Sequence, residues 1–316
     1  MSRYREADLS RLTNTSVADR PTRVSVADFA KPLDPGVART VLESLPDQLA
    51  ARALRELVAR TAAAHREGRP IVAMIGGHVI KVGVSPCLIA LLDRGVVTHL
   101  AMNGAAAIHD VEIARIGRTS EDVEANLHAG RFGMVDETGD FMNEAMRAGA
   151  ALGEGLGECW GRAVEEAGAP HRDVCLLAAA WRRRIPATVH VAIGTDTIHH
   201  HPRCDGAALG ETTLRDFRIF AATLAEARGA VVFNFGSAVL MPEVFLKALS
   251  VARNLGADLA GLTTANFDQI QHYRPRVNVV ERPTRGAEGG KGYSLTGHHE
   301  ILLPLFTAAV LARLGD

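Results

Sequence analysis

Short, unbroken apolar runs alternate along this chain with stretches of helical periodicity, and this alternation constrains the fold more than any other feature. The runs lie at 71–75, 96–102, 187–193, 230–235 and 258–263. The helical patterns lie near 85–94, 105–115, 137–167, 211–227, 242–254 and 298–313. Buried parallel strands are apolar along their whole length, and strand–helix alternation is typical of βαβ units. The sequence therefore predicts an α/β protein with a doubly wound, mostly parallel sheet and helices on both faces.

The first 33 residues differ from the rest because they are polar, mixed in charge and only weakly periodic. We predict an N-terminal arm over 1–33, followed by a single α/β domain over 34–316. Asp34-Pro35 is a helix-start signal, and apolar residues recur at helical spacing from Val41 to Val58. Pro46 is expected to kink or split that helix.

Charge and cysteine content narrow the class of protein. The 35 basic and 36 acidic side chains give a net charge of −1, which argues against a nucleic-acid partner bound through counterion release. No apolar stretch approaches the ~20 residues that span a bilayer, and the first residues lack an apolar signal region. The four cysteines form no C-x-x-C pair. We expect a cytoplasmic protein with no membrane partner.

Small and polar residues follow the predicted strands. Their ends read Gly76-Gly77-His78, Asn103-Gly104-Ala105, Gly194-Thr195-Asp196, Gly236-Ser237 and Thr263-Thr264-Ala265-Asn266. Open parallel sheets bind ligands at the carboxyl ends of their strands, and the helix N-termini that follow favour anionic groups such as phosphates. These positions therefore predict a ligand site, although βα turns and helix caps need the same residue types.

The most unusual of these stretches runs from Asn103 to Glu112. It places His109, Asp110 and Glu112 just after a strand end, in an otherwise apolar helix. The three ionisable groups are candidates for chemistry. The alternative is that the carboxylates only stabilise the helix dipole.

Other motifs favour a structural interpretation. Gly149, Gly153 and Gly157 are spaced by four and predict a small-residue helix face for close packing, since neither standard phosphate loop is present. The run His199-His200-His201 with Cys204 has no metal-ligand spacing, so we expect a loop with one functional histidine and no metal site. His298-His299-Glu300 opens the last helix either as a cap or as part of a site.

Several of these segments, taken in order, resemble a known family. Gly77 to Gly83 (GHVIKVG) and Asn103 to Glu112 (NGAAAIHDVE) resemble the deoxyhypusine synthase-like NAD-binding family, in particular its archaeal-type ornithine cyclodeaminase branch. Later segments are similar to deoxyhypusine synthase itself. These are Ile185-Pro186 leading to Thr195-Asp196, Phe233 to Ser237, Asn254 to Asp258, Thr263 to Asp268, and Leu303-Pro304-Leu305. The resemblance covers roughly residues 65–312.

The resemblance implies a Rossmann-like sheet that binds NAD at the carboxyl edge of its strands, in homotetramers (dimers of dimers) whose active sites lie at a dimer interface. It implies that NAD takes a hydride from an amine carbon, and that a nucleophile or water attacks the resulting imine. With the strand-end pattern, it makes the following residues cofactor-binding candidates: Gly76, Gly77, His78, Asn103, Gly104, Thr195, Asp196, Gly236, Ser237 and Thr264. His109, Asp110, Glu112 and Asp268 would face the ribose or the amine.

One departure concerns the family's active-site lysine, which lies in a Trp-Gly-Lys segment soon after an Arg-Pro pair. Here Arg274-Pro275 is present, but neither Trp nor Lys follows closely. Lys291, in a glycine-rich stretch predicted to be a loop, could substitute or be a surface residue. Lys81 is the other candidate, as a phosphate partner or amine nucleophile, unless it is an ordinary solvated lysine.

The sequence thus predicts an NAD-dependent enzyme that acts on a small cationic amine or amino acid, of polyamine or ornithine type. Asp110, Glu112, Asp196 and Asp268 are the candidate partners of its ammonium groups. The alternatives are an ornithine cyclodeaminase-like lyase, a deoxyhypusine-type transferase that uses Lys291, and a non-catalytic nucleotide-binding protein.

Overall fold

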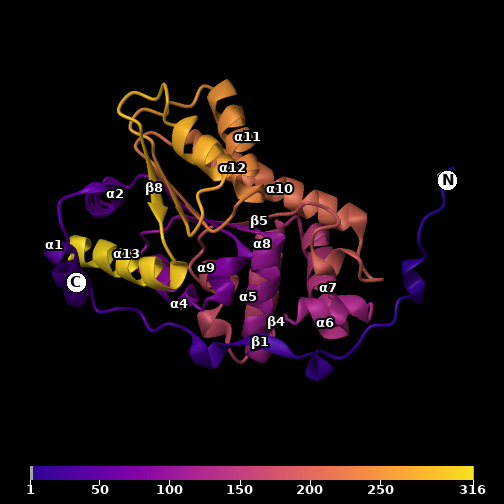
Figure 1. Cartoon of the computed structure of the whole chain (residues 1–316). Coiled ribbons are helices and arrows are strands. Elements are labelled where there is room, and N and C mark those ends of the chain that lie inside the picture. The colour runs from indigo at the N-terminus through magenta and orange to yellow at the C-terminus, as the bar shows by residue number, and fades with distance from the viewer. Residues whose placement is uncertain (1–2, 316) are drawn as a thin grey trace.

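A computed structural model describes residues 3–315. Figure 1 shows the whole chain. Its centre is a parallel sheet of six strands in the order β5-β3-β2-β6-β7-β8. The strands are β2 (Ile71–Ile75), β3 (His99–Asn103), β5 (Ala187–His190), β6 (Val231–Phe235), β7 (Thr263–Asp268) and β8 (Lys291–Thr296). From β2 the chain moves to one side through β3 and β5, then to the other through β6, β7 and β8. The predicted doubly wound α/β fold is confirmed.

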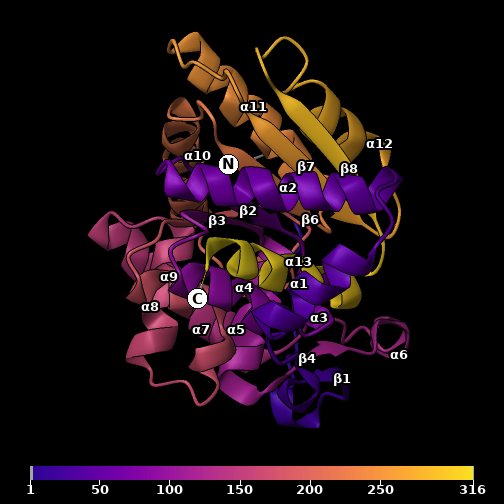
Figure 2. The ribbon, with the colours of Figure 1, turned by 90° about the vertical axis from the view of Figure 1, so that its left-hand side faces the viewer.

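Helices cover both faces of the sheet. One face packs on α2 (Leu49–Arg66), α4 (Ser85–Asp93), α5 (Gly104–Ile116), α9 (Leu176–Arg182) and α13 (His299–Leu314). The other face packs on α10 (Gly206–Ala225) and α11 (Leu240–Asn254). Figure 2 shows α2 crossing the near side of the sheet, with α13 beside it. Alternate residues of β2, β3 and β6 enter the two hydrophobic layers, as the period of two of a β-strand requires.

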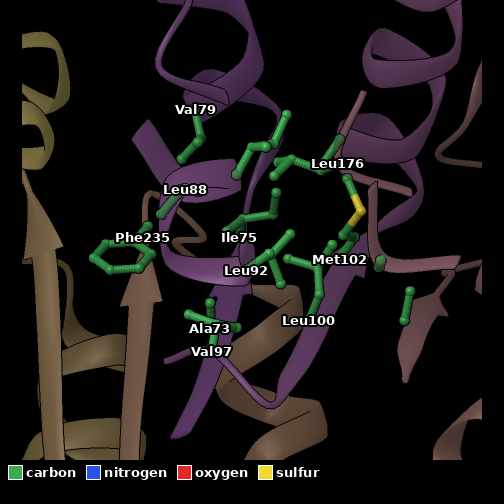
Figure 3. Close-up of a cluster of buried hydrophobic side chains, with 14 of the residues drawn as sticks. Ala73, Ile75, Val79, Leu88, Leu92, Val97, Leu100, Met102, Leu176 and Phe235 are labelled. Carbon is green, nitrogen blue, oxygen red and sulfur yellow. The ribbon is translucent and has the colours of Figure 1, made fainter. Parts of the chain in front are cut away.

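Figure 3 shows the larger of these layers, where Ala73 and Ile75 of β2 and Met102 of β3 meet helix side chains. Leu88 of α4 and Leu176 of α9 lie in the same cluster and are buried. Burial of each such side chain stabilises the fold by about 1.5–3 kcal/mol. This layer holds α5, and so its polar residues, at a fixed position relative to the strand ends.

The remaining elements are shorter or peripheral. The helices are α1 (Pro35–Ser44), α3 (Gly77–Lys81), α6 (Val123–His128), α7 (Asp136–Leu152), α8 (Leu156–Glu166) and α12 (Tyr273–Pro275), and a π-helical turn covers Arg276–Glu281. Short 3₁₀ turns lie at Leu9–Arg11, Val17–Asp19, Val26–Asp28, Arg172–Val174 and Thr197–His199. A two-stranded sheet joins β1 (Thr22–Ser25) and β4 (Arg118–Glu121). Within residues 3–315, no helix is both long enough and apolar enough to cross a membrane.

The helix predicted around Pro46 is divided as expected. Asp34 caps α1 by accepting a hydrogen bond from the Val37 N–H at 3.1 Å, and α1 ends at Ser44 before α2 begins at Leu49. The break follows because proline has no N–H and disfavours helical geometry in the residue before it.

The helix predicted over 137–167 is wrong as a single element. It divides where Gly153 ends α7 with φ +77°, a conformation that favours glycine. The small residues do allow close packing. A Cβ on Gly149 would lie 2.3 Å from Cβ of Cys159 in α8, and one on Gly157 would lie 2.2 Å from the Ala187 carbonyl oxygen of β5. Gly149 thus allows α7 to pack closely on α8, and Gly157 allows α8 to pack closely on β5. The three glycines do not form one helix face.

The last two strands also differ from prediction. The run 258–263 is mainly a turn, in which the Asp258 carboxylate accepts a hydrogen bond from the Ala260 N–H at 2.8 Å, and the strand is β7, five residues further along. Lys291 begins β8 instead of lying in a loop. Both strands are rich in polar residues, so apolar runs could not reveal them.

The N-terminal segment is attached to the rest of the chain through α7 and β4 (Figure 1). The Glu137 carboxylate accepts hydrogen bonds from Ser16 Oγ at 2.5 Å and from the Val17 N–H at 2.8 Å. β1 pairs antiparallel with β4, with Thr22 opposite Glu121. The division into 1–33 and 34–316 stays a prediction, but residues 15–25 pack against residues more than 90 positions away.

Candidate functional site

The carboxyl ends of the strands meet at one edge of the sheet because all six run parallel. At the crossing point, where the strand order reverses between β2 and β6, the two backbones touch. A Cβ on Gly76 would lie 2.4 Å from the carbonyl oxygen of Gly236, so only glycine fits there. This crossing point is where doubly wound sheets bind their ligands.

A cavity of about 200 Å³ lies beside this edge. Its walls come from α3, α5, β4, the N-terminal segment and the loop after β5. Five of the residues predicted from the sequence line it: Lys81, His109, Glu112, Thr195 and Asp196. A second hollow of about 220 Å³ shares Phe132, Thr195, Asp196 and Thr197 with it. The structure therefore gathers predicted residues from three separate segments around one space.

His109 and Glu112 are connected through a buried threonine. His109 Nδ1 lies 2.7 Å from Thr119 Oγ1, and that hydroxyl donates to Glu112 Oε2 at 2.5 Å. Burial, together with the positive charges of Lys81 and Arg20, lowers the pKa of His109 to about 4. The His109 ring also lies against the first residue of α3, since a Cβ on Gly77 would be 3.2 Å from its Cδ2.

Glu112 is held by an arginine from the N-terminal segment. Arg20 donates to Glu112 Oε1 at 2.8 Å and lies 3.9 Å from Glu121, and all three side chains are buried. Thr138 Oγ1 donates to the same Glu112 oxygen at 3.1 Å. Burial raises the pKa of Glu121. The cavity wall therefore contains one cation between two carboxylates.

Asp196 has one carboxylate oxygen that no other group uses. Its side chain accepts a hydrogen bond from the His199 N–H in a capping box, but among residues 3–315 its Oδ2 has no hydrogen-bond partner, and His199 Nε2 lies 3.7 Å from it. The residue is 7% exposed. Burial raises its pKa to about 6. A Cβ on Gly104, the first residue of α5, would lie 2.1 Å from Oδ2, so the carboxylate packs directly on that helix N-terminus.

Lys81 is the cation of this cavity that has no counter-ion. It ends α3 and is exposed, and no ion pair joins it to any other described residue. Its ammonium group is close enough to lower the pKa of both His78 and His109. A cation without a counter-ion and a buried carboxylate oxygen without a hydrogen bond thus line the same small space.

A second polar group occupies the other half of the edge. The rings of His78 and His299 lie 5.5 Å apart, and His299 Nε2 donates to the Phe267 carbonyl at 3.0 Å. His299 Nδ1 is then a buried acceptor with no partner within the described part of the chain. Burial, and the neighbouring His299, lower the pKa of His78. Asp268, which ends β7, is 8% exposed.

Other predicted cofactor-binding residues at the edge serve the fold locally. Asn103 caps α5 by accepting from the Ala106 N–H at 2.9 Å, and Ser237 Oγ accepts from the Met241 N–H at 3.2 Å near the start of α11. Asn234 of β6 donates to Ser237 O at 3.0 Å and to Asn266 Oδ1 at 2.7 Å. Its own Oδ1 has no partner in the described chain.

Three predicted site residues lie elsewhere. Asp110 is fully buried, and its carboxylate accepts hydrogen bonds from the Leu176 and Leu177 N–H groups, each at 2.9 Å. It therefore caps the start of α9 and does not line the cavity. Thr264 is the second residue of β7, opposite Val232, because the strand begins later than predicted. Lys291 is the first residue of β8, opposite Thr263, which places it at the amino edge of the sheet.

Sequence reasoning did not identify Arg20, Thr119 or Glu121. Arg20 lies in a segment with no periodicity, and residues 118–121 form a strand too short and too polar to stand out. No three His, Cys, Asp or Glu side chains among residues 3–315 are arranged to hold a metal ion.

No family model matches the sequence, and no curated protein matches it. Solved structures do. ArgZ in its apo form, an arginine dihydrolase from the ornithine–ammonia cycle in cyanobacteria, aligns with a TM-score of 0.50 at 17% identity, over 83% of this chain and 31% of its own. AgrE in a ternary complex with ornithine and NAD+ aligns with a TM-score of 0.51 at 14% identity, over 82% and 32%.

A third structure, from Entamoeba histolytica and named after deoxyhypusine synthase, aligns over 89% of this chain and 96% of its own, at 9% identity and a TM-score of 0.49. This chain spans about a third of the length of ArgZ and AgrE. At these identities the alignments establish a shared fold with part of those two proteins.

Proposed function

We propose that this chain is an NAD-dependent enzyme that acts on a small amine or amino acid, removing a hydride from the amine-bearing carbon and returning it within one cycle. The observation that carries the proposal is the cavity at the carboxyl edge, where Lys81, His109 and Asp196 surround one small space beside the strand crossing. The shared fold supports it, since AgrE has been solved with ornithine and NAD+.

The residues at the edge fit a dinucleotide. Gly76 and Gly236 meet at the crossing point, Gly77 opens α3 without a side chain, and His78 follows it. Among the buried polar atoms at this edge that lack partners within residues 3–315, His299 Nδ1 and Asn234 Oδ1 could receive hydroxyl groups of the dinucleotide. We assign the dinucleotide to these residues; when bound, NAD supplies the hydride acceptor.

The cavity itself suits a molecule with charges of both signs. Lys81 can pair with a carboxylate, while Asp196 can pair with an ammonium group. About 200 Å³ corresponds to roughly seven water volumes, so the substrate is small. This favours an amino acid such as ornithine, and hence the lyase alternative, over a polyamine that carries only positive charges.

The transferase alternative that uses Lys291 has no support from this geometry, because Lys291 begins β8 at the opposite edge from the cavity. The homotetramer implied by the family resemblance stays a prediction, which sedimentation analysis of the purified chain would test.

Thermal unfolding with and without NAD+ tests the proposal. A ligand present at 100 times its Kd stabilises the folded state by about 2.7 kcal/mol, so NAD+ should raise the Tm. His299→Phe should reduce the shift, because it removes the buried Nδ1 acceptor, whereas Asp205→Asn, at a half-buried helix cap, should keep it. No shift with millimolar NAD+ would contradict the proposal.

Substrate is tested by incubating the NAD+-loaded chain with L-ornithine or with putrescine. Release of ammonia from L-ornithine alone supports the lyase, and turnover of putrescine alone argues for a polyamine enzyme. Binding of NAD+ without turnover of any amine would indicate the non-catalytic alternative.

A further inference from the structure

The hydrogen bonds around His109 determine where its proton lies. A threonine hydroxyl has one proton to donate. Glu112 is ion-paired with Arg20, so its carboxylate only accepts, and Thr119 must donate to it. The Thr119 oxygen then accepts from His109, which places the imidazole proton on Nδ1.

The other ring nitrogen is consequently a free acceptor. A neutral imidazole carries one N–H, so Nε2 keeps its lone pair. Nε2 has no hydrogen-bond partner among residues 3–315. It is also not one of the fully buried unpartnered atoms, so it is accessible. His109 lines the cavity, and since its Nδ1 is turned to Thr119, Nε2 is the ring nitrogen left for that space.

The surroundings keep this arrangement in place. Thr119 is fully buried. Its neighbour Ser120 has φ +65°, a backbone conformation that residues other than glycine rarely adopt. Such backbone strain persists only where the rest of the structure enforces it. The groups that face His109 are Lys81 from α3, Glu112 and Thr119 from α5 and β4, and Arg20 from the N-terminal segment.

We propose that His109 accepts a proton from the substrate through Nε2, and that Thr119, Glu112 and Arg20 are positioning residues that fix its tautomer. This rests on the proposed function for the identity of the proton donor, the ammonium group of the substrate. The N–H bond of the substrate breaks, its electron pair stays on nitrogen, and a new N–H bond forms at Nε2. The neutral amine then has the lone pair that loss of a hydride from the adjacent carbon requires.

The charges in the cavity adjust to this step. Burial, with the charge of Lys81, holds His109 neutral in the free chain, since both lower the pKa of the ring. A substrate carboxylate paired with Lys81 offsets that charge and makes Nε2 more basic. The imidazolium that forms keeps its Nδ1–H on Thr119, and through it the Glu112 carboxylate stabilises the new charge.

Nitrogen NMR of the full chain labelled at histidine tests the tautomer directly. The signal of His109, assigned by its loss in His109→Gln, should show Nδ1 protonated and Nε2 unprotonated at neutral pH. Thr119→Val should abolish that preference. Thr138→Val is the matched control, because it removes a hydroxyl that donates to Glu112 without touching His109, and it should leave the signal unchanged.

Kinetics with L-ornithine and NAD+ provide the second measurement. Loss of a general base lowers kcat by about 10²–10⁴-fold, so His109→Ala should do so with little change in KM, and added imidazole should restore part of the rate. A His109 protonated on Nε2 in the unmodified chain, or a His109→Ala variant with unchanged kcat, would overturn the inference. A chain that NAD+ does not stabilise would overturn the proposed function instead.

Discussion

Arg20 is the residue through which the N-terminal segment reaches the cavity. Its guanidinium lies between Glu112 and Glu121, both buried, and donates to the first at 2.8 Å. Without it, two carboxylates would share a low-dielectric site, where ionised groups carry a large desolvation penalty. Arg20 therefore contributes both to stability and to the charge of Glu112 on which the orientation of His109 depends.

Arg20→Met should lower the free energy of unfolding by about 3–5 kcal/mol, because it leaves a buried charge without its partner. Urea denaturation measures this. Arg23→Met is the matched control three residues away. Arg23 pairs with Asp122 at 2.8 Å, but its side chain is 67% exposed, so the loss should stay below about 1 kcal/mol. Equal losses in the two variants would show that burial of the Arg20 pair is unimportant.

At the scale of elements, α5 serves two neighbours at once. Asp110 and Glu112 are two positions apart, which corresponds to about 200° around a helix of 3.6 residues per turn. Glu112 therefore lines the cavity, while Asp110 points to α9 and accepts hydrogen bonds from its first N–H groups and from Cys175 Sγ at 3.0 Å. Burial raises the pKa of Asp110 to about 6. The site helix is thus anchored by a carboxylate that takes no part in the cavity.

Asp110→Ala should destabilise the fold by about 2–3 kcal/mol, since it leaves buried N–H groups of α9 without acceptors. Hydrogen exchange should speed up first at the amides of Leu176 and Leu177. Asp205→Ala provides the comparison. Asp205 caps α10 at the surface, by accepting from Ala207 and Ala208, and should cost about 1 kcal/mol. Unchanged exchange in α9 would reject the anchoring role of Asp110.

At the scale of the whole molecule, buried histidines make the fold sensitive to acid. Burial lowers the pKa of both His99 of β3 and His190 of β5 to about 3. Both rings lie within hydrogen-bond distance of Thr188 Oγ1 of β5. A folded pKa below the unfolded value of about 6.5 means that the unfolded chain binds the extra proton. The stability from each histidine is therefore present above about pH 6.5 and is lost as the pH falls toward 3.

Each such histidine should remove about 1.4 kcal/mol of stability per pH unit in that window. Three buried carboxylates oppose this trend: burial raises the pKa of Asp110 and Asp196 to about 6 and that of Asp216 to about 8, so each favours the folded state as the pH falls below its own pKa. His190→Gln keeps those carboxylates and should unfold with a shallower dependence on pH, in urea denaturation between pH 7 and 4. His128→Gln, at an exposed position, should behave like the unmodified chain. Parallel pH profiles for all three would contradict the argument.

The sequence by itself determined the central strands and most of the helices. β2 and most of β6 are apolar because both strands are buried on both faces, and α1 begins just after Asp34 because local capping decides helix ends. Where burial alone determines the residue types of a segment, the sequence pattern predicts its secondary structure. Five of the candidate residues that it indicated line one cavity, because parallel strands bring their carboxyl ends to one edge; these are Lys81, His109, Glu112, Thr195 and Asp196.

Only the tertiary structure decided the rest. β7 can be polar because Asn266 finds a partner in Asn234 of the neighbouring strand, 32 positions away, and no local pattern records such a pairing. The same holds for Arg20 and Thr119, which reach Glu112 from separate segments, and for Lys291, whose strand pairing carries it to the far edge. Residue types indicate which chemistry a chain can perform, but the direction of a side chain depends on what packs around it.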